Sequence, residues 1–222
     1  MSVAAPLIAS APLRIGLTGP IASGKSTVAG MLRAMGAEII DADEVYRSLV
    51  RPGTPLLASI AQRFGNEILD RNGELDRNKL AEIVFADAFA LADLEHLTHP
   101  AVLAEIYRQM ERSRSPVIVV EAIKLIQSGL AKDMDQLWFI TADPEVRVER
   151  LRLRNGISAE SAQSRVSLGN DPLPATMQLD VLIDTSGNIA ATRRDVEKAW
   201  HTRVSSGSEE PHALAHGSKE VR

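Results

Sequence analysis

Short apolar runs alternate along the chain with longer stretches in which apolar positions recur every three or four residues, the spacing of a helix face. The run at residues 116–123 is the richest in β-branched residues, which predicts a central strand. Strands that alternate with helices indicate an α/β fold, a doubly wound parallel sheet with helices on both faces. We predict five strands, at residues 13–18, 38–43, 116–123, 136–142 and 180–187.

Turn and capping residues mark the ends of the predicted helices. Thr54 follows a Pro-Gly turn and is a candidate cap for the helix that ends near Phe64. Pro144 and Gly156 are typical of the first residue and the stop of one helix. The pattern predicts further helices at residues 26–37, 76–113 (with a break near residues 98–100) and 188–203.

The two ends of the chain have a different composition from its body. Residues 1–12 are apolar, but Pro6 and Pro12 interrupt them and no Lys or Arg precedes them, so we expect a disordered extension and not a signal peptide. Residues 204–222 are rich in Ser, Gly, Glu and His, which predicts a disordered tail. Residues 13–203 are therefore expected to form a single domain.

Composition narrows the classes of protein. The chain has 222 residues, of which 45% are hydrophobic, enough for one α/β domain of ordinary size. The net charge is -4, so no overall basic excess favours a nucleic acid partner. There are no cysteines and no apolar run near the ~18 residues that a membrane span needs. We expect a cytoplasmic protein that binds neither nucleic acid nor membrane.

The stretch GPIASGKST, residues 19–27, matches the phosphate-binding P-loop pattern G-x-x-x-x-G-K-[ST]. Glycines let backbone N–H groups turn towards an anion, and the helix that follows directs its positive end to the same place. The Lys25 side chain, which we expect to be exposed, can reach the β- and γ-phosphates, and the Ser26 hydroxyl can ligate Mg²⁺. We predict that ATP is bound by Gly19, Pro20, Ile21, Ala22, Ser23, Gly24, Lys25, Ser26 and Thr27.

P-loop proteins include GTPases, motor ATPases and small-molecule kinases. The sequence contains no N-K-x-D motif for reading guanine. Motor ATPases usually carry an acidic residue after a hydrophobic strand, and Glu121 is the nearest candidate. The small size and the acidic end of the second strand favour a kinase.

That acidic end contains Asp41 and Asp43. In a doubly wound fold the second strand ends at the same edge as the P-loop, so both carboxylates are expected near the transferred phosphate. A carboxylate there can orient or deprotonate an acceptor hydroxyl. Alternatively, Asp43 caps the helix that follows it. Both interpretations remain open from the residues alone.

Arg147, Arg150 and Arg154 fall on one face of the helix that begins at Pro144. Arginines there can bind phosphate oxygens as charge spreads in a transition state. The alternative is a solvent-exposed face in which these arginines pair with Glu145 and Glu149.

The order of these motifs resembles that of the dephospho-CoA kinase family. The P-loop, D-A-D, R-P-G-T-P, L-D-R and H-P occur in the family's order, and the similarity covers residues 13–203. The stretches that carry it are residues 15–55, 73–85, 97–100, 147–158 and 181–187.

The resemblance implies transfer of the γ-phosphate of ATP to the ribose 3′-hydroxyl of dephospho-CoA, the last step of CoA synthesis, with Mg²⁺ as cofactor. It further implies that Asp43 is the catalytic carboxylate, that Lys25 clamps phosphate and that Arg154 is an arginine of the lid. A helical insertion at about residues 54–113 would border CoA, and residues 144–175 would form the lid.

The resemblance also implies the remaining binding residues. Those near the CoA substrate would be Thr18, Asp43, Arg77, His99 and Pro100. Ser186 and Gly187 would lie in the loop that packs on adenine.

Two departures from the family pattern leave other functions open. Gly169 stands where the family usually has Gln, and no Lys or Arg occurs between Arg165 and Asp180. Glu121 and Lys124 replace apolar or neutral residues. The alternatives are a weak or inactive module that binds ATP or CoA, and a kinase for another nucleotide-like alcohol.

Overall fold

The computed structural model describes residues 11–168 and 177–204. Gly169, the two prolines of residues 171–174, nearly all of the N-terminal extension and the tail beyond residue 204 lie outside these ranges. Within the described ranges, no helix combines the length and apolar character needed to cross a membrane.

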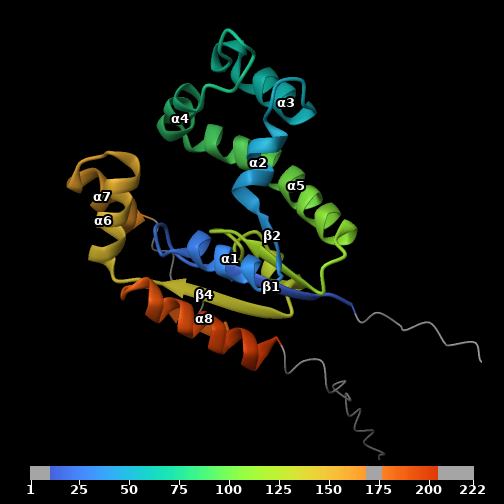
Figure 1. Ribbon diagram of the computed structural model, residues 1–222. Coiled ribbons are helices and arrows are strands. Elements are labelled where there is room, and N and C mark those ends of the chain that lie inside the picture. Colours follow the sequence, from blue (N-terminus) through green and yellow to red (C-terminus); the bar gives the residue numbers. More distant parts are fainter. Residues whose placement is uncertain (1–10, 169–176, 205–222) are drawn as a thin grey trace, which may run out of the picture.

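The predicted five-stranded parallel sheet is confirmed, with the strand order β2-β3-β1-β4-β5 (Figure 1). Strand β3 is buried along its whole length between β2 and β1, as its β-branched residues predict. Leu17 lies opposite both Glu121 and Trp138, so β3, β1 and β4 end near one another. The strands are β1 Leu13–Thr18, β2 Glu38–Asp41, β3 Val117–Glu121, β4 Gln136–Thr141 and β5 Val181–Asp184.

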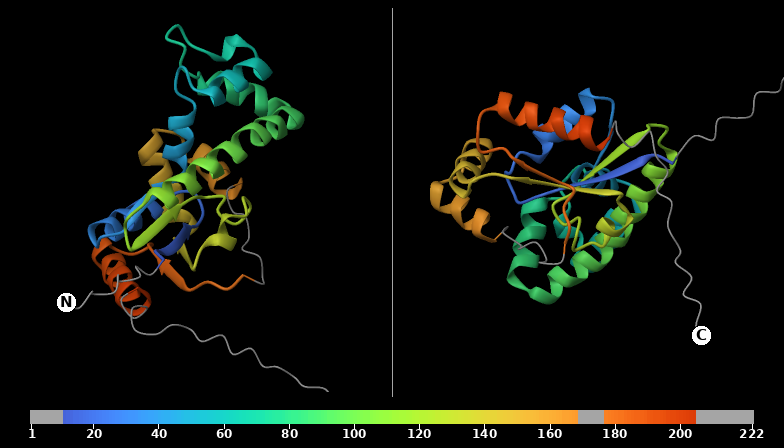
Figure 2. Two further views of the ribbon diagram at one scale, coloured as in Figure 1. Left: turned by 90° about the vertical axis from the view of Figure 1, so that its right-hand side faces the viewer. Right: turned by 90° about the horizontal axis from the view of Figure 1, so that it is seen from below.

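Helices cover both faces of the sheet, and each face has its own apolar core. Helices α1 (Lys25–Ala34) and α8 (Ile189–Arg203) pack on one face around the fully buried Trp138. Helices α2 (Ala42–Leu49) and α5 (Ala88–Arg112) pack on the other. Figure 2 shows α8 and α5 on opposite sides of the sheet.

A helical insertion rises above the carboxyl edge of the sheet (Figure 1). It contains α3 (Pro55–Phe64), the 3₁₀ helix η1 (Asn66–Ile68), α4 (Arg77–Ala86) and the first half of α5. These elements bury a separate apolar cluster, so the insertion is stabilised by a core of its own.

A second, smaller helix pair stands at the same edge of the sheet (Figure 1). It consists of α6 (Pro144–Asn155) and α7 (Ala159–Leu168), which pack around Leu151. Gly156 ends α6 in the left-handed conformation at φ 64°, as its place in the sequence predicts. Another 3₁₀ helix, η2 (Leu130–Asp133), precedes β4.

The second strand ends earlier than predicted, and this changes the role of its acidic residues. Strand β2 stops at Asp41, whose side chain accepts hydrogen bonds from the backbone N–H groups of Asp43 and Glu44 at 2.8 and 3.3 Å. Asp41 therefore caps α2, and the interpretation of Asp43 as the cap was wrong. The Asp43 side chain is free of this role because Asp43 already lies inside the first turn.

Two other helix ends differ from the sequence-based expectations. Helix α5 runs through Pro100 without a break, and the interruption falls at Asp87, which accepts a hydrogen bond from the N–H of Phe89. Packing of α5 against α2, α3 and α4 outweighs the local cost of a proline inside a helix. Thr54 precedes α3 as predicted, but its hydroxyl donates to the Arg51 carbonyl at 2.7 Å and does not cap the helix.

We predict that Asp41→Ala lowers the free energy of unfolding by about 1 kcal/mol, because two N–H groups of α2 lose their acceptor. Asp41→Asn should retain most of the stability, since Asn caps as well as Asp. Urea denaturation followed by circular dichroism measures both. A loss in Asp43→Asn comparable to that in Asp41→Ala would contradict this assignment of the cap.

Candidate active site

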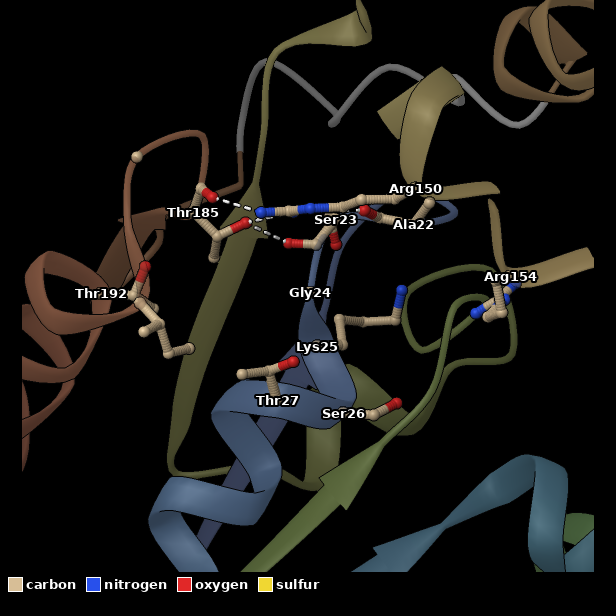
Figure 3. Close-up of a pocket in the computed structure, with 12 residues that line it drawn as sticks. Ala22, Ser23, Gly24, Lys25, Ser26, Thr27, Arg150, Arg154, Thr185 and Thr192 are labelled. Atoms are coloured by element: carbon tan, nitrogen blue, oxygen red, sulfur yellow. Dashed lines mark hydrogen bonds between the residues drawn. The ribbon is translucent and has the colours of Figure 1, made fainter. Parts of the chain in front are cut away.

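The P-loop lies between β1 and α1 (Figure 3). Its backbone takes positive φ angles at Gly19 and Gly24, which glycine adopts without strain. Gly19 has φ 147°, and a Cβ at this position would lie 2.0 Å from the Ile140 carbonyl oxygen. Gly24 has φ 89° at the start of α1, and within the part of the chain that the structure describes no side chain caps the first turn of that helix. The positive end of α1 is therefore directed at the loop.

A pocket of about 380 Å³ opens beside this loop. Gly24 to Thr27 form one wall, and residues of α6, α8 and the loop after β5 form the others. Of the residues predicted to bind ATP, those that line this pocket are Ala22, Ser23, Gly24, Lys25, Ser26, Thr27 and Gly187.

The other predicted ATP residues do not line the pocket. The carbonyl oxygens of Gly19 and Pro20 accept hydrogen bonds from Lys25 Nζ at 2.9 and 3.0 Å. The Ser186 hydroxyl donates to Asp184 at 2.6 Å and accepts from the N–H of Asp143 at 2.8 Å. These residues shape the loops around the pocket, and Ile21 packs against the cluster formed by α6 and α7.

The Lys25 side chain is only 7% exposed, so the expectation of an exposed lysine was wrong. Burial lowers the pKa of its ammonium group from 10.5 to about 8, and the nearby carboxylates of Glu121 and Asp43 offset part of this effect. Its two backbone acceptors hold Nζ in place. The loop thus keeps one poorly hydrated cation beside the pocket.

Glu121 lies at the end of β3, where it accepts a hydrogen bond from the Ser26 hydroxyl at 2.8 Å. Its side chain is buried, and burial raises its pKa, while the bond from Ser26 acts in the opposite direction. The parallel register of β1 and β3 brings these two residues together, although 95 positions separate them in the chain.

Two arginines of α6, Arg150 and Arg154, line the P-loop pocket. Arg150 donates to the Thr185 side chain at 2.8 Å and to its carbonyl at 2.6 Å, and Arg154 lines the pocket (Figure 3). Arg147 is buried. The alternative of a solvent-exposed face was wrong for Arg147 and Arg150, whereas Arg154 is exposed and its Nε donates to Asn155 Oδ1 at 3.0 Å. Glu149 pairs with Arg152 at 2.8 Å.

Sequence reasoning missed several residues of this pocket. Arg150 was placed on the correct face but not assigned to the site, and its partner Thr185 was not predicted. Thr185 also donates to the Ser23 carbonyl at 2.7 Å, which ties the loop after β5 to the P-loop. Its position directly before Ser186 was the only sequence signal. Ile189 and Thr192 complete the lining from α8.

A second pocket, of about 370 Å³, lies between α2, α5 and the loop after β3. Its lining is mostly apolar, and Asp43 lies in its wall. Among the predicted substrate residues, Asp43 and His99 line this pocket. Tyr46 and Lys124 also line it, and neither was assigned to the substrate site from the sequence.

The remaining predicted substrate residues lie elsewhere. Thr18 is buried and its hydroxyl donates to the Ile123 carbonyl at 3.2 Å, so it supports the loop that forms one wall. Arg77 is exposed at the start of α4, close enough to counteract the rise in the pKa of Tyr46 that burial causes. Pro100 lies within α5 and does not line the pocket.

The site thus combines a P-loop pocket for a phosphate chain with a neighbouring pocket that presents a carboxylate. Lys25 lines the first pocket and Asp43 lines the second, and the two side chains interact electrostatically. A parallel α/β sheet with this loop and an acidic residue at the start of α2 defines a nucleotide-binding kinase of the P-loop class.

Comparison with known proteins identifies the family. The sequence model described as dephospho-CoA kinase matches residues 13–190, and the chain belongs to this family. It is 42% identical over 202 residues to the dephospho-CoA kinase of Symbiobacterium thermophilum, covering 90% of this chain and 84% of that protein.

Solved structures agree with this assignment. The fold is similar to that of TT1252 from Thermus thermophilus, with a TM-score of 0.73, 28% identity and coverage of 87% of this chain and 98% of that one. It is also similar to the dephospho-CoA kinase from Campylobacter jejuni, with a TM-score of 0.64, 26% identity and coverage of 88% and 98%.

The buried Lys25 makes stability depend on pH in a defined direction. Its pKa is about 8 in the folded protein against 10.5 for an exposed lysine, so the unfolded chain holds more protons between these values. The free energy of unfolding should therefore rise with pH across this window. At lower pH the folded protein must keep a charged ammonium group buried.

We predict that Lys25→Met removes this pH dependence and makes the protein more stable at neutral pH, by on the order of 1–3 kcal/mol. Methionine is unbranched and apolar, so it can occupy the same space without the cost of burying a charge. Chemical denaturation of both proteins across the pH window measures the difference. A variant less stable than the parent at every pH would show that the two carbonyl hydrogen bonds outweigh the burial of the charge.

Proposed function

We propose that the protein transfers the γ-phosphate of ATP to the ribose 3′-hydroxyl of dephospho-CoA and so forms CoA, the last step of CoA biosynthesis. The observation that carries this proposal is that Lys25, which lines the P-loop pocket, interacts electrostatically with Asp43, which lines the second pocket. Membership of the dephospho-CoA kinase family supports the choice of acceptor.

ATP would occupy the P-loop pocket. The backbone N–H groups of the loop and the positive end of α1 would hold its phosphates, with Lys25 Nζ reaching the β- and γ-phosphate oxygens. Gly187 and Ile189, which also line the pocket, would border the adenine. Arg154 would bind the oxygens of the transferred group, on which negative charge accumulates.

Ser26 is the proposed ligand of Mg²⁺. Its hydroxyl donates a hydrogen bond to Glu121, which leaves the oxygen lone pairs available to a cation. Within the described ranges, no group of three acidic or histidine side chains could hold a metal alone. This donor set fits Mg²⁺, which is bound mainly by phosphate oxygens, water and one or two protein groups, and which neutralises phosphate charge during transfer.

Asp43 would orient the acceptor hydroxyl and take its proton. In the reaction the ribose 3′-oxygen forms a bond to the γ-phosphorus, the bond from that phosphorus to the bridging oxygen breaks, and ADP leaves. The hydroxyl proton passes to the Asp43 carboxylate. His99 would contact the acceptor in the second pocket, while Thr18 and Pro100 act through the shape of its walls and Arg77 from outside it.

The direct test is to incubate the protein with ATP, Mg²⁺ and dephospho-CoA and to detect CoA by mass spectrometry. We expect CoA in the presence of all three components and its loss in Lys25→Ala, which removes the cation from the P-loop. A module that only binds ATP or CoA would give no product. A kinase for another nucleotide-like alcohol would leave dephospho-CoA unchanged but phosphorylate that alcohol.

We predict that Asp43→Asn lowers kcat by about 10²-fold and leaves ATP affinity, measured by calorimetry without acceptor, unchanged. The two side chains have nearly the same shape, so the loss reports the missing charge and proton acceptor. Because Asp41 is the cap of α2, the melting temperature should also stay constant. Unchanged kcat would remove Asp43 from the mechanism and leave Glu121 as the next candidate.

A further inference from the structure

Lys124 brings a positive charge to the wall of the acceptor pocket. It lies in the loop that follows β3, and its Nζ bonds to the Glu95 carboxylate on α5 at 2.7 Å. The side chains of Lys124 and Glu95 are 57% and 39% exposed, so solvent reaches both members of this ion pair. The pair bridges the loop after β3 and the helical insertion.

The charges in this pocket are few. Among the described residues that line it, Lys124 is the single Lys or Arg, and Asp43 is the single Asp or Glu. His99 lies beside them, and the other lining side chains are apolar or uncharged. The pocket therefore presents a carboxylate for a hydroxyl and, on a different element, a cation for an anionic group.

The pocket is too small to hold both the hydroxyl-bearing part and the anionic part of the acceptor. A volume of about 370 Å³ is at the small end of the range for ligand sites, so only part of a molecule as long as dephospho-CoA can lie inside. If the ribose hydroxyl is at Asp43, the adenosine occupies the pocket. The 5′-diphosphate must then leave through the rim, where a half-exposed lysine can reach it.

We propose that Lys124 binds the 5′-diphosphate of the acceptor and exchanges Glu95 for phosphate oxygens when the acceptor enters. This inference rests on the proposed function. An exposed ion pair contributes little net energy, whereas a diphosphate offers more charge and several oxygens to the same ammonium group. Glu95 thus holds Lys124 at the rim in the empty protein, and the diphosphate replaces it in the complex.

The main test compares two acceptors in Lys124→Ala. Dephospho-CoA carries the diphosphate, whereas adenosine has the same 3′-hydroxyl and lacks it. We expect kcat/KM for dephospho-CoA to fall about tenfold through a higher KM, the effect of one charge-assisted hydrogen bond, with kcat/KM for adenosine and KM for ATP unchanged. Lys198→Ala is the matched control, because Lys198 is an exposed residue of α8, on the opposite face of the sheet from α5.

Glu95→Gln is the second arm of the test. It frees Lys124 from its partner, so dephospho-CoA should bind up to about threefold more tightly, with adenosine unaffected. If Glu95→Gln weakens binding as much as Lys124→Ala does, the ion pair shapes the wall and the proposal is overturned. An equal loss for both acceptors in Lys124→Ala, or no loss for either, also overturns it.

Failure of the inference and failure of the proposed function give different results. Absence of CoA formation by the unaltered protein contradicts the proposed function. Calorimetric titration of dephospho-CoA without ATP tests Lys124 independently of turnover. There, Lys124→Ala must weaken binding relative to Lys198→Ala, and added salt must weaken binding less in Lys124→Ala than in the unaltered protein, since one screened charge contact is missing.

Discussion

The site depends on the parallel direction of the five strands. Because β1, β2 and β3 end at the same edge of the sheet, the P-loop, Asp41 and Glu121 meet there despite wide separations in sequence. The register is fixed by apolar residues on both faces, which two separate cores bury. A shift of one residue along β3 would place Glu121 on the other side of the pleat and break its bond to Ser26.

Lys25 shows how this edge is prepared for phosphate. Its ammonium group is largely buried, and the backbone carbonyls and the nearby carboxylates of Glu121 and Asp43 compensate only in part, so its pKa falls. A phosphate chain would supply the missing negative charge, so part of the cost of desolvation is met when the fold forms and not when the ligand binds. Burial of the Lys25 ammonium group thus lowers the stability of the free protein and would strengthen the binding of phosphate.

The two helical elements above the sheet are attached in different ways. The pair α6 and α7 is attached through Arg150 on α6, whose guanidinium donates to Thr185 in the loop after β5. The Thr185 hydroxyl in turn donates to the Ser23 carbonyl of the P-loop. The α3–α5 insertion has an apolar core of its own and meets the loop after β3 through Lys124 and Glu95. The P-loop pocket is thus bordered by hydrogen bonds between α6, the loop after β5 and the P-loop, whereas the second pocket is bordered by an ion pair that solvent reaches.

Local sequence determined the number, order and approximate positions of the strands, the P-loop and the stop at Gly156, because apolar periodicity and glycine conformations depend on neighbouring residues. Tertiary structure alone decided that Asp41 caps α2 and that α5 continues through Pro100, since both depend on where the chain packs. It also decided the burial of Lys25 and the contacts of Arg150. Their surroundings come from residues distant in the chain, such as those of β3 and the loop after β5, which no local pattern encodes.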